Sequence, residues 1–245
     1  MIELPRPTLV LTAHGSRDVR FEATARRIAA ATAAALRGVR VELGFLDLNA
    51  PLVDEALAGL SGRVTVLPLL FGDGYHSKID LPAMLAAARA VDPGLRVTQT
   101  PIVGRYSPVP ALTDRLTEAG FVADGRTGVL LYAVGSSDPG SDASVRERGA
   151  ELAGALGVPV RTVFATRLGS DGAAVTAAVD ELRAEGVSRI AASPLFLSAG
   201  LLTERVERVL DRCAPGSVVA GPIGAHPSLI AAVSRLYHAS LPALV

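Results

Sequence analysis

Two histidines and one aspartate follow the ends of three consecutive apolar segments of the chain. His14 comes directly after the apolar run 8–13, and Asp47 and His76 follow the ends of the next two such segments. These segments predict strands of a parallel sheet, whose carboxyl ends meet at one edge and form the usual ligand site of open α/β folds. Two imidazoles and one carboxylate suit Fe²⁺, Co²⁺, Ni²⁺ or Zn²⁺ better than Mg²⁺ or Ca²⁺. The sequence therefore predicts a metal site with open coordination positions.

The same side chains allow other interpretations. An imidazole with an unperturbed pKa of about 6.5 also accepts protons at neutral pH, so His14 and His76 are candidates for proton transfer. Asp47 lies where a strand leads into a helix and equally fits a helix N-cap. His226 precedes a proline at an expected helix entrance, from which it could reach the site, whereas His238 is expected on the surface of the last helix.

Composition excludes several classes of function. The 245 residues carry 24 basic and 24 acidic side chains, without a basic block interleaved with aromatics, so a nucleic-acid partner is not expected. The single cysteine, Cys213, excludes an internal disulfide and a thiolate metal cluster. The start of the chain does not resemble a signal peptide, and no apolar run reaches the ~18 residues of a membrane span. A cytoplasmic protein without membrane contact is expected.

The elements that would position these side chains alternate between strand and helix. The expected order in the first half is strand 8–13, helix 19–36, strand 39–46, helix 51–60, strand 64–70, helix 82–91, strand 95–100 and helix 109–117. Such alternation predicts a parallel sheet with right-handed crossovers and helices on both faces.

The pattern then begins again. Residues 128–136 (GVLLYAVGS) match the first strand and its turn, and residues 193–202 (SPLFLSAGLL) match 67–76 (LPLLFGDGYH). The chain is therefore expected to hold two similar doubly wound α/β domains, 1–120 and 121–245, which arose by duplication and have a cleft between them.

The two copies differ where chemistry is expected. The second copy carries Val134 at the position of His14 and Leu202 at the position of His76, although the glycines and prolines around them are kept. The histidines are therefore not needed for the fold, and the first domain is predicted to carry the active side chains. A monomer with one active site, apolar on the side of the second domain, follows from this asymmetry.

Four segments together resemble a known family. They are LTAHGSRD at 11–18, FLD at 45–47, GYHSKIDLP at 74–82 and PIVG at 101–104, and they resemble the sirohydrochlorin chelatases in their long, two-domain form. The resemblance covers nearly the whole chain and extends to the anaerobic cobalt chelatases of cobalamin synthesis. It implies that His14 and His76 are the catalytic pair, which binds metal and accepts protons. Asp47, in a place where the family most often has glutamate, is implied as the third metal ligand.

The resemblance also implies a reaction, in which a lyase inserts Fe²⁺ or Co²⁺ into sirohydrochlorin with release of two protons. No cofactor is expected beyond the substrate metal, Fe²⁺, Co²⁺ or Ni²⁺. The carboxylates of the tetrapyrrole require local cations, for which Arg17 and Lys78, the only lysine, are the first candidates and Arg105, Arg167 and Arg205 the next. The residues expected to contact the substrate are Ser16, Arg17, Gly74, Tyr75, Ser77 and Lys78.

Two other functions remain open from the sequence. A metallochaperone or a tetrapyrrole carrier would use the same ligands without turnover. A histidine phosphatase-like enzyme would use His14 as a nucleophile, but Ala13 stands where such enzymes have the arginine that binds phosphate. A serine hydrolase is not expected, because Ser16 and Ser136 lie outside a Gly-x-Ser-x-Gly sequence.

Overall fold

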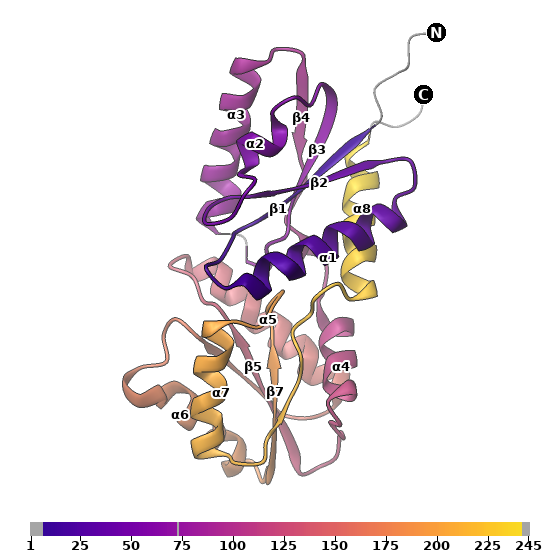
Figure 1. The fold of residues 1–245 in the computed structure, drawn as a ribbon. Coiled ribbons are helices and arrows are strands. Elements are labelled where there is room, and N and C mark those ends of the chain that lie inside the picture. Colours follow the sequence, from indigo (N-terminus) through magenta and orange to yellow (C-terminus); the bar gives the residue numbers. More distant parts are fainter. Residues whose placement is uncertain (1–6, 73, 242–245) are drawn as a thin grey trace. The chain divides into compact units, whose positions relative to one another are not determined.

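The computed structural model describes residues 7–72 and 74–241 and contains two four-stranded parallel sheets (Figure 1). The strand order is β2-β1-β3-β4 in one sheet and β6-β5-β7-β8 in the other. The chain divides into two compact units, one formed by Met1–Tyr106 with Ala225–Val245 and the other by Ser107–Gly224. The predicted fold class, two similar parallel α/β sheets, is confirmed.

The first unit holds ten of the described elements. They are β1 (Thr8–Ala13), α1 (Val19–Ala35), β2 (Arg40–Phe45), α2 (Val53–Leu57), β3 (Gly62–Pro68), a π-helical turn (His76–Asp80), α3 (Leu81–Val91), β4 (Leu95–Gln99) and α8 (Pro227–Ser240), with a 3-10 turn at Val103–Arg105.

The second unit has a similar alternation of strands and helices within one continuous segment, which begins with a helix rather than a strand. Its elements are α4 (Val109–Glu118), β5 (Thr127–Ala133), α5 (Pro139–Leu156), β6 (Val160–Phe164), a 3-10 turn (Ser170–Gly172), α6 (Ala173–Ala184), β7 (Arg189–Pro194), α7 (Leu201–Cys213) and β8 (Val218–Val219).

Strand β1 is central in the first sheet and is buried along its whole length. It pairs in parallel with β2 on one side and with β3 on the other, so the chain reverses its direction across the sheet between them. Right-handed crossovers then require α1 on one face and α2 and α3 on the other. The loops that follow β1 and β3 consequently flank the switch point, where open α/β sheets bind their ligands.

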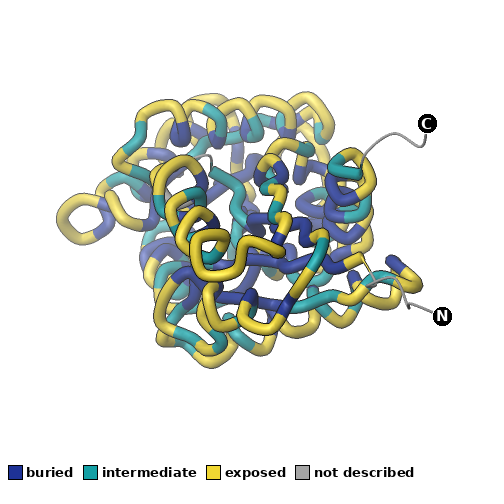
Figure 2. Tube along the Cα trace, turned by 90° about the horizontal axis from the view of Figure 1, so that it is seen from above, coloured by how far each residue is buried: buried dark blue, intermediate teal, exposed yellow. Residues whose placement is uncertain are grey.

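Each helix buries one face against its sheet. Buried and exposed residues alternate along the helices, while the strands are mostly buried (Figure 2). In the first unit Val10, Val64 and Val66 of the sheet form one apolar cluster with Leu81 and Leu85 of α3. No helix within 7–72 and 74–241 is long and apolar enough to cross a membrane.

The last helix of each sequence repeat lies in the unit formed mainly by the other repeat. Helix α8 packs against α1 and β3 of the first unit, whereas α4 packs against α5 and β7 of the second. The two helices thus cover equivalent strands, and their buried leucines, such as Leu112 on α4 and Leu236 on α8, complete those cores. The compact units therefore differ from the sequence halves 1–120 and 121–245.

Two segments near the candidate site differ from the sequence-based expectation. The helix expected over 51–60 is only α2, because Leu52 stands at its N-cap and Gly59 with a φ of +75° follows its end. The segment Tyr75–Lys78, expected as a loop, enters a π-helical turn. The hydroxyl of Ser77 donates to the carbonyl of Gly74 at 2.9 Å there and stabilises the start of the turn.

Candidate metal centre

His14 is the first residue after β1, at the carboxyl edge of the first sheet. Its side chain is half-buried, and Nδ1 lies 3.2 Å from the carbonyl oxygen of Gly15. Because β1 is buried and paired on both sides, the strand holds the main chain of His14 at a defined place beside the switch point.

The loop after β2 lies directly against the loop that carries His14. The N–H of Asp47 donates to the carbonyl of His14 at 3.0 Å, and with the bond from Leu46 N–H to the carbonyl of Ala13 at 2.9 Å it extends the pairing of β1 and β2 beyond the strands. Gly15 has a φ of +100°, and a Cβ at this position would overlap the carbonyl oxygen of Asp47. Only glycine allows this close approach, so the sequence His-Gly brings the main chains of His14 and Asp47 together.

The side chain of Asp47 is exposed and is not a helix cap. Helix α2 begins six residues later and has Leu52 at its N-cap, so the alternative of an N-cap role for Asp47 is wrong. Oδ1 of Asp47 accepts a hydrogen bond from the N–H of Leu48 at 2.7 Å. Its other carboxylate oxygen accepts no hydrogen bond from the described part of the chain. That oxygen is therefore available to a ligand.

The structure describes only part of the third candidate ligand, His76. The main chain of His76 begins the π-helical turn after β3, but its side chain lies outside the described residues. The turn is tied to the neighbouring strand, since the Gln99 side chain donates to the carbonyl of Ser77 at 2.9 Å. Among the described side chains, no group of three or more His, Cys, Asp or Glu residues could hold a metal. The set His14, Asp47 and His76 thus stays a prediction.

The six residues expected to contact substrate fall into two kinds. Arg17, Tyr75 and Lys78 are exposed at the loops that follow β1 and β3. The other three residues instead stabilise the main chain of these loops. The hydroxyl of Ser16 accepts a hydrogen bond from Asp18 N–H. The carbonyl of Gly74 accepts hydrogen bonds from the hydroxyl of Ser77 and from Lys78 N–H.

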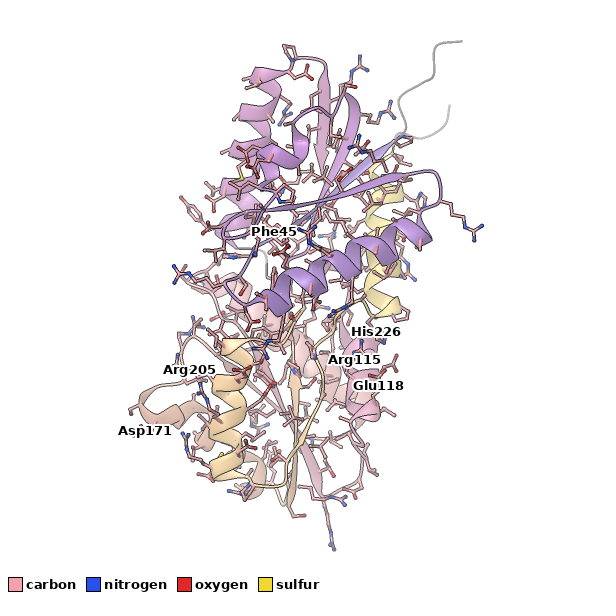
Figure 3. All side chains as sticks on the ribbon, in the orientation of Figure 1. Phe45, Arg115, Glu118, Asp171, Arg205 and His226 are labelled. Atoms are coloured by element: carbon pink, nitrogen blue, oxygen red, sulfur yellow. The ribbon has the colours of Figure 1, made fainter. Side chains whose placement is uncertain are left out.

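The three weaker arginine candidates are not equivalent. Arg105 and Arg205 are exposed, and Arg205 lies in the second turn of α7 (Figure 3). Arg167 forms an ion pair with Asp142, and its guanidinium lies 4.9 Å from the ring centre of Phe164. These contacts give Arg167 a local structural role in the second unit.

Apart from Tyr75, sequence reasoning missed the exposed apolar side chains at the same edge. Val19, Leu48, Tyr75 and Ile79 follow β1, β2 and β3 and are 80%, 47%, 67% and 50% exposed. Exposed aliphatic and aromatic side chains gathered around strand ends favour contact with a largely apolar ligand. For Val19, Leu48 and Ile79 the only signal in the sequence was a large apolar residue after each of the three expected strands.

The second unit has the same main-chain arrangement but other side chains at the positions of the candidate ligands. Thr166 N–H donates to the carbonyl of Val134 at 3.0 Å, so Thr166 occupies the position of Asp47 and Val134 that of His14. The Thr166 hydroxyl also donates to this carbonyl at 2.7 Å. With Leu202 at the position of His76, all three candidate ligands are replaced in the second unit, one more than the sequence comparison had found.

The remaining two histidines have other surroundings. His226 is buried at the N-cap of α8, where its Nδ1 accepts a hydrogen bond from Ser228 N–H at 3.2 Å (Figure 3). Its side chain thus serves as a helix cap. His238 is exposed near the end of α8, as the sequence predicted.

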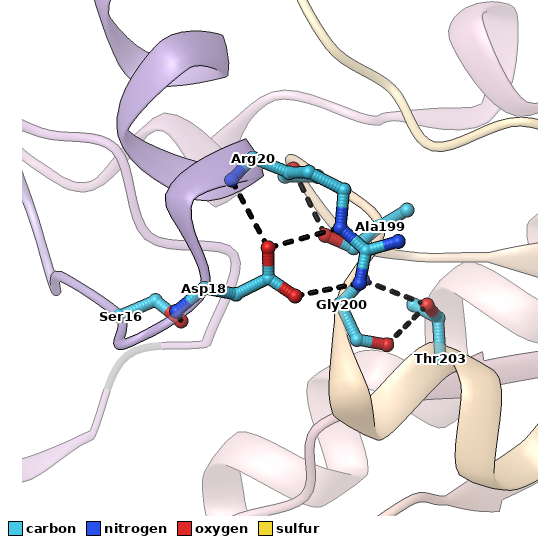
Figure 4. A network of polar contacts seen from close by, with 7 residues as sticks. Ser16, Asp18, Arg20, Ala199, Gly200 and Thr203 are labelled. Atoms are coloured by element: carbon cyan, nitrogen blue, oxygen red, sulfur yellow. Dashed lines mark hydrogen bonds and ion pairs between the residues drawn. The ribbon is translucent and has the colours of Figure 1, made fainter.

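An aspartate caps the helix that follows the His14 loop. Asp18 accepts hydrogen bonds from the main-chain N–H and the guanidinium of Arg20, and its own N–H donates to the hydroxyl of Ser16 (Figure 4). The hydrogen bonds from Arg20 lower the pKa of Asp18 from 3.8 to about 2. Asp18 therefore carries its negative charge at any pH at which the protein works.

Known proteins resemble this chain in sequence and in fold. A sirohydrochlorin cobaltochelatase of Saccharolobus islandicus is 45% identical over 49 residues, which cover 18% of this chain and only 38% of that protein. A sirohydrochlorin ferrochelatase of Bacillus subtilis is 24% identical over 232 residues, 91% of this chain and 87% of that protein. The crystal structure of the sirohydrochlorin chelatase SirB from Bacillus subtilis subspecies spizizenii, in complex with cobalt, shares the fold with a TM-score of 0.77 and 22% identity, over 95% of this chain and 94% of that one.

The assignment of the chain to a family rests on a match to both sequence repeats. The CbiX family model matches residues 8–119 and again residues 128–239, so that each sequence repeat is one copy of the family's unit. These two matches contain every candidate ligand and all three positions that replace them in the second repeat. The chain therefore belongs to the CbiX family, the sirohydrochlorin chelatases that its histidine motifs resemble.

Proposed function

We propose that this protein is a lyase that inserts Co²⁺ or Fe²⁺ into sirohydrochlorin. The observation that carries the proposal is the paired His14 and Asp47 loops at the switch point of the first sheet, in a chain whose family and full-length relative are chelatases. The equivalent positions of the second unit keep the same main-chain bond with valine and threonine side chains. The candidate ligands are thus confined to one of two similar edges.

The proposed ligands fit the needs of metal transfer. Imidazole nitrogen from His14 and His76 and carboxylate oxygen from Asp47 suit borderline divalent metals and leave coordination positions for the incoming pyrrole nitrogens. Insertion forms bonds from the metal to the ring nitrogens while two pyrrole N–H bonds break. A neutral imidazole that is not holding the metal can accept the two protons one after the other and pass each of them to water.

The surroundings of His14 fit the substrate class. Sirohydrochlorin is a flat, partly apolar ring with carboxylates at its rim. Leu48, Tyr75 and Ile79 offer exposed apolar surface near the strand ends, and Arg17 and Lys78 offer positive charge. A substrate that needs both kinds of contact agrees with a protein of balanced net charge, because the cations act locally.

The decisive experiment is metal insertion by the purified protein. Sirohydrochlorin is incubated with Co²⁺, Fe²⁺ or Ni²⁺ in turn, and the absorbance change is followed against the spontaneous reaction. His14→Ala and His76→Ala are each expected to remove nearly all catalysed insertion. His238→Ala, an exposed histidine far along the chain from the site, is the matched control and should keep the wild-type rate.

The same experiment separates an enzyme from a carrier. A metallochaperone or tetrapyrrole carrier would bind metal or ring in proportion to protein and show no turnover beyond one equivalent. We further propose a monomer that binds about one metal per chain, because the second unit lacks all three ligands. Sedimentation and Co²⁺ titration test these two statements, and two equivalent metals per chain would contradict the assignment of the second unit.

A further inference from the structure

The loop after β2 contains an asparagine, Asn49, that is not among the expected site residues. Asn49 is half-buried, and its Oδ1 accepts a hydrogen bond from the N–H of Ser16 at 2.7 Å. Its Nδ2 donates to Oε2 of Glu22 on α1 at 3.3 Å, and its own N–H donates to the carbonyl of Asp47 at 2.8 Å. The Asn49 side chain thus connects its own loop, which carries Asp47, to the His14 loop and to α1.

The chemistry of the amide matches both of its partners. Ser16 N–H requires an acceptor and the Glu22 carboxylate requires a donor, and the amide side chain of Asn49 supplies one of each. Glu22 is itself held by Arg26, which also donates to the carbonyl of Ala50 at 3.3 Å. The contact between the two loops is therefore supported from α1 through two neighbouring residues of the Asp47 loop.

The second unit closes the equivalent turn with different atoms. There the N–H of Ser136 donates to Oδ1 of Asp142 on α5 at 2.9 Å, and Asp142 is paired with Arg167. A carboxylate neutralised by an arginine is thus sufficient to hold this turn. The first unit uses a neutral amide, which adds no second negative charge beside Asp47, and it does so in the repeat that carries the candidate ligands.

We infer that Asn49 is a positioning residue that sets the separation of His14 and Asp47 for binding of a divalent metal, an inference that rests on the proposed function. The residue touches neither the metal nor the tetrapyrrole. It acts through Ser16 and Asp47, whose main chains it bonds directly. Residues that orient metal ligands in this way affect metal affinity by about 10- to 100-fold when they are removed.

The test is a titration of the whole protein with Co²⁺ in the absence of tetrapyrrole, followed by insertion kinetics. Asn49→Ala is expected to weaken Co²⁺ binding about tenfold or more and to raise the KM for metal more than it lowers kcat. Asn49→Asp keeps an acceptor for Ser16 N–H and should bind Co²⁺ more tightly than Asn49→Ala. A role limited to folding would change the melting temperature and leave the Co²⁺ affinity of the folded protein unchanged.

Two controls come from the chain itself. Asp142→Ala removes the acceptor of the equivalent turn in the second unit and should leave Co²⁺ affinity within about twofold of wild type, since no candidate ligand lies there. If Asn49→Ala does not fold, Glu22→Ala replaces it. It removes the partner of Nδ2 and the exposed ion pair with Arg26 but keeps the bond from Ser16 N–H to Asn49, and it should still weaken Co²⁺ binding by more than about twofold. Glu42→Ala, which removes an exposed ion pair with Arg40 elsewhere in the first unit, is its matched control.

The outcomes separate the two proposals. Asn49→Ala or Glu22→Ala with the Co²⁺ affinity of wild type would overturn the positioning role, even if wild-type protein metallates sirohydrochlorin. Wild-type protein that binds Co²⁺ without inserting it would overturn the chelatase function, while the affinities of the variants would still decide the role of Asn49. Wild-type protein that binds no Co²⁺ would overturn both.

Discussion

The main-chain N–H of Asp47 donates to the carbonyl oxygen of His14 at 3.0 Å, so two residues 33 positions apart are joined directly beyond the ends of their strands. Val134 and Thr166 make the same bond in the second unit. The bond therefore belongs to the fold, and the side chains at its two ends decide whether the edge can hold a metal. The main-chain scaffold is thus common to both units, and the chemistry depends on the side chains.

Gly15→Ala is expected to destabilise the protein strongly and to abolish metal insertion, because the added Cβ would overlap the carbonyl of Asp47 at a positive φ. The free energy of unfolding should fall by about 3 kcal/mol or more. Gly38→Ala is the matched control, since Gly38 also has a positive φ but nothing lies near its Cβ position, and about 1 kcal/mol is expected there. Equal decreases in the free energy of unfolding of the two variants, measured with urea, would show that the close approach of Gly15 to Asp47 does not matter.

The ionised Asp18 stabilises the folded protein, because its pKa is lowered from 3.8 to about 2 by its bonds with Arg20. A lowered folded-state pKa gives stability that is fully present above about pH 4 and is lost as the pH falls through about 2. The difference in melting temperature between wild type and Asp18→Asn should therefore be constant above pH 4 and vanish near pH 2. An NMR titration of the Asp18 carboxyl with a midpoint near 4 would contradict the assignment.

Residues 107–224 are expected to fold when produced alone, because this single continuous segment forms the whole second unit. The sequence repeat 121–245 lacks α4, which covers β7 and α5, and carries α8, whose partners α1 and β3 lie in the other unit. We expect it to unfold non-cooperatively or to aggregate. Circular dichroism melts of the two fragments make the comparison, and a cooperative transition of 121–245 alone would refute the importance of the exchanged helices.

Tyr132→Phe should lower the free energy of unfolding by about 1 kcal/mol, because the buried phenol donates to Oε1 of Glu207 at 2.8 Å. Burial, with the nearby carboxylate, raises the pKa of Tyr132 well above its usual range, so the phenol stays a donor at working pH.

Tyr237→Phe is the control for this substitution. The hydroxyl of Tyr237 is also buried but has no hydrogen-bond partner within the described residues. Its removal should be neutral or stabilising, since it relieves the cost of a buried unpaired group. Urea denaturation of both variants measures the contrast, and the reverse order of stability would contradict the assigned bond.

Much of the arrangement could be predicted from local patterns. Neighbouring residues define the apolar runs that become β1 and β3, and also the match of GVLLYAVGS to the first strand and its turn. Period, turn chemistry and capping act over a few positions, so they can be interpreted without knowledge of distant contacts. Helix α2 was predicted too long because the apolar pattern shows neither the bond from Leu52 N–H to the Glu55 side chain at its start nor the positive φ of Gly59 after its end.

The sequence by itself determined the fold class, the family motifs and the placement of His14 and Asp47 at one edge of a parallel sheet, because carboxyl ends of parallel strands must meet. Only the tertiary structure decided that α4 and α8 are exchanged between the units, that Asn49 bonds Ser16, and that Thr166 stands in the place of Asp47. These relations depend on strand register and on contacts between residues tens of positions apart. No local preference of the chain specifies such contacts, which form only when the whole unit has packed.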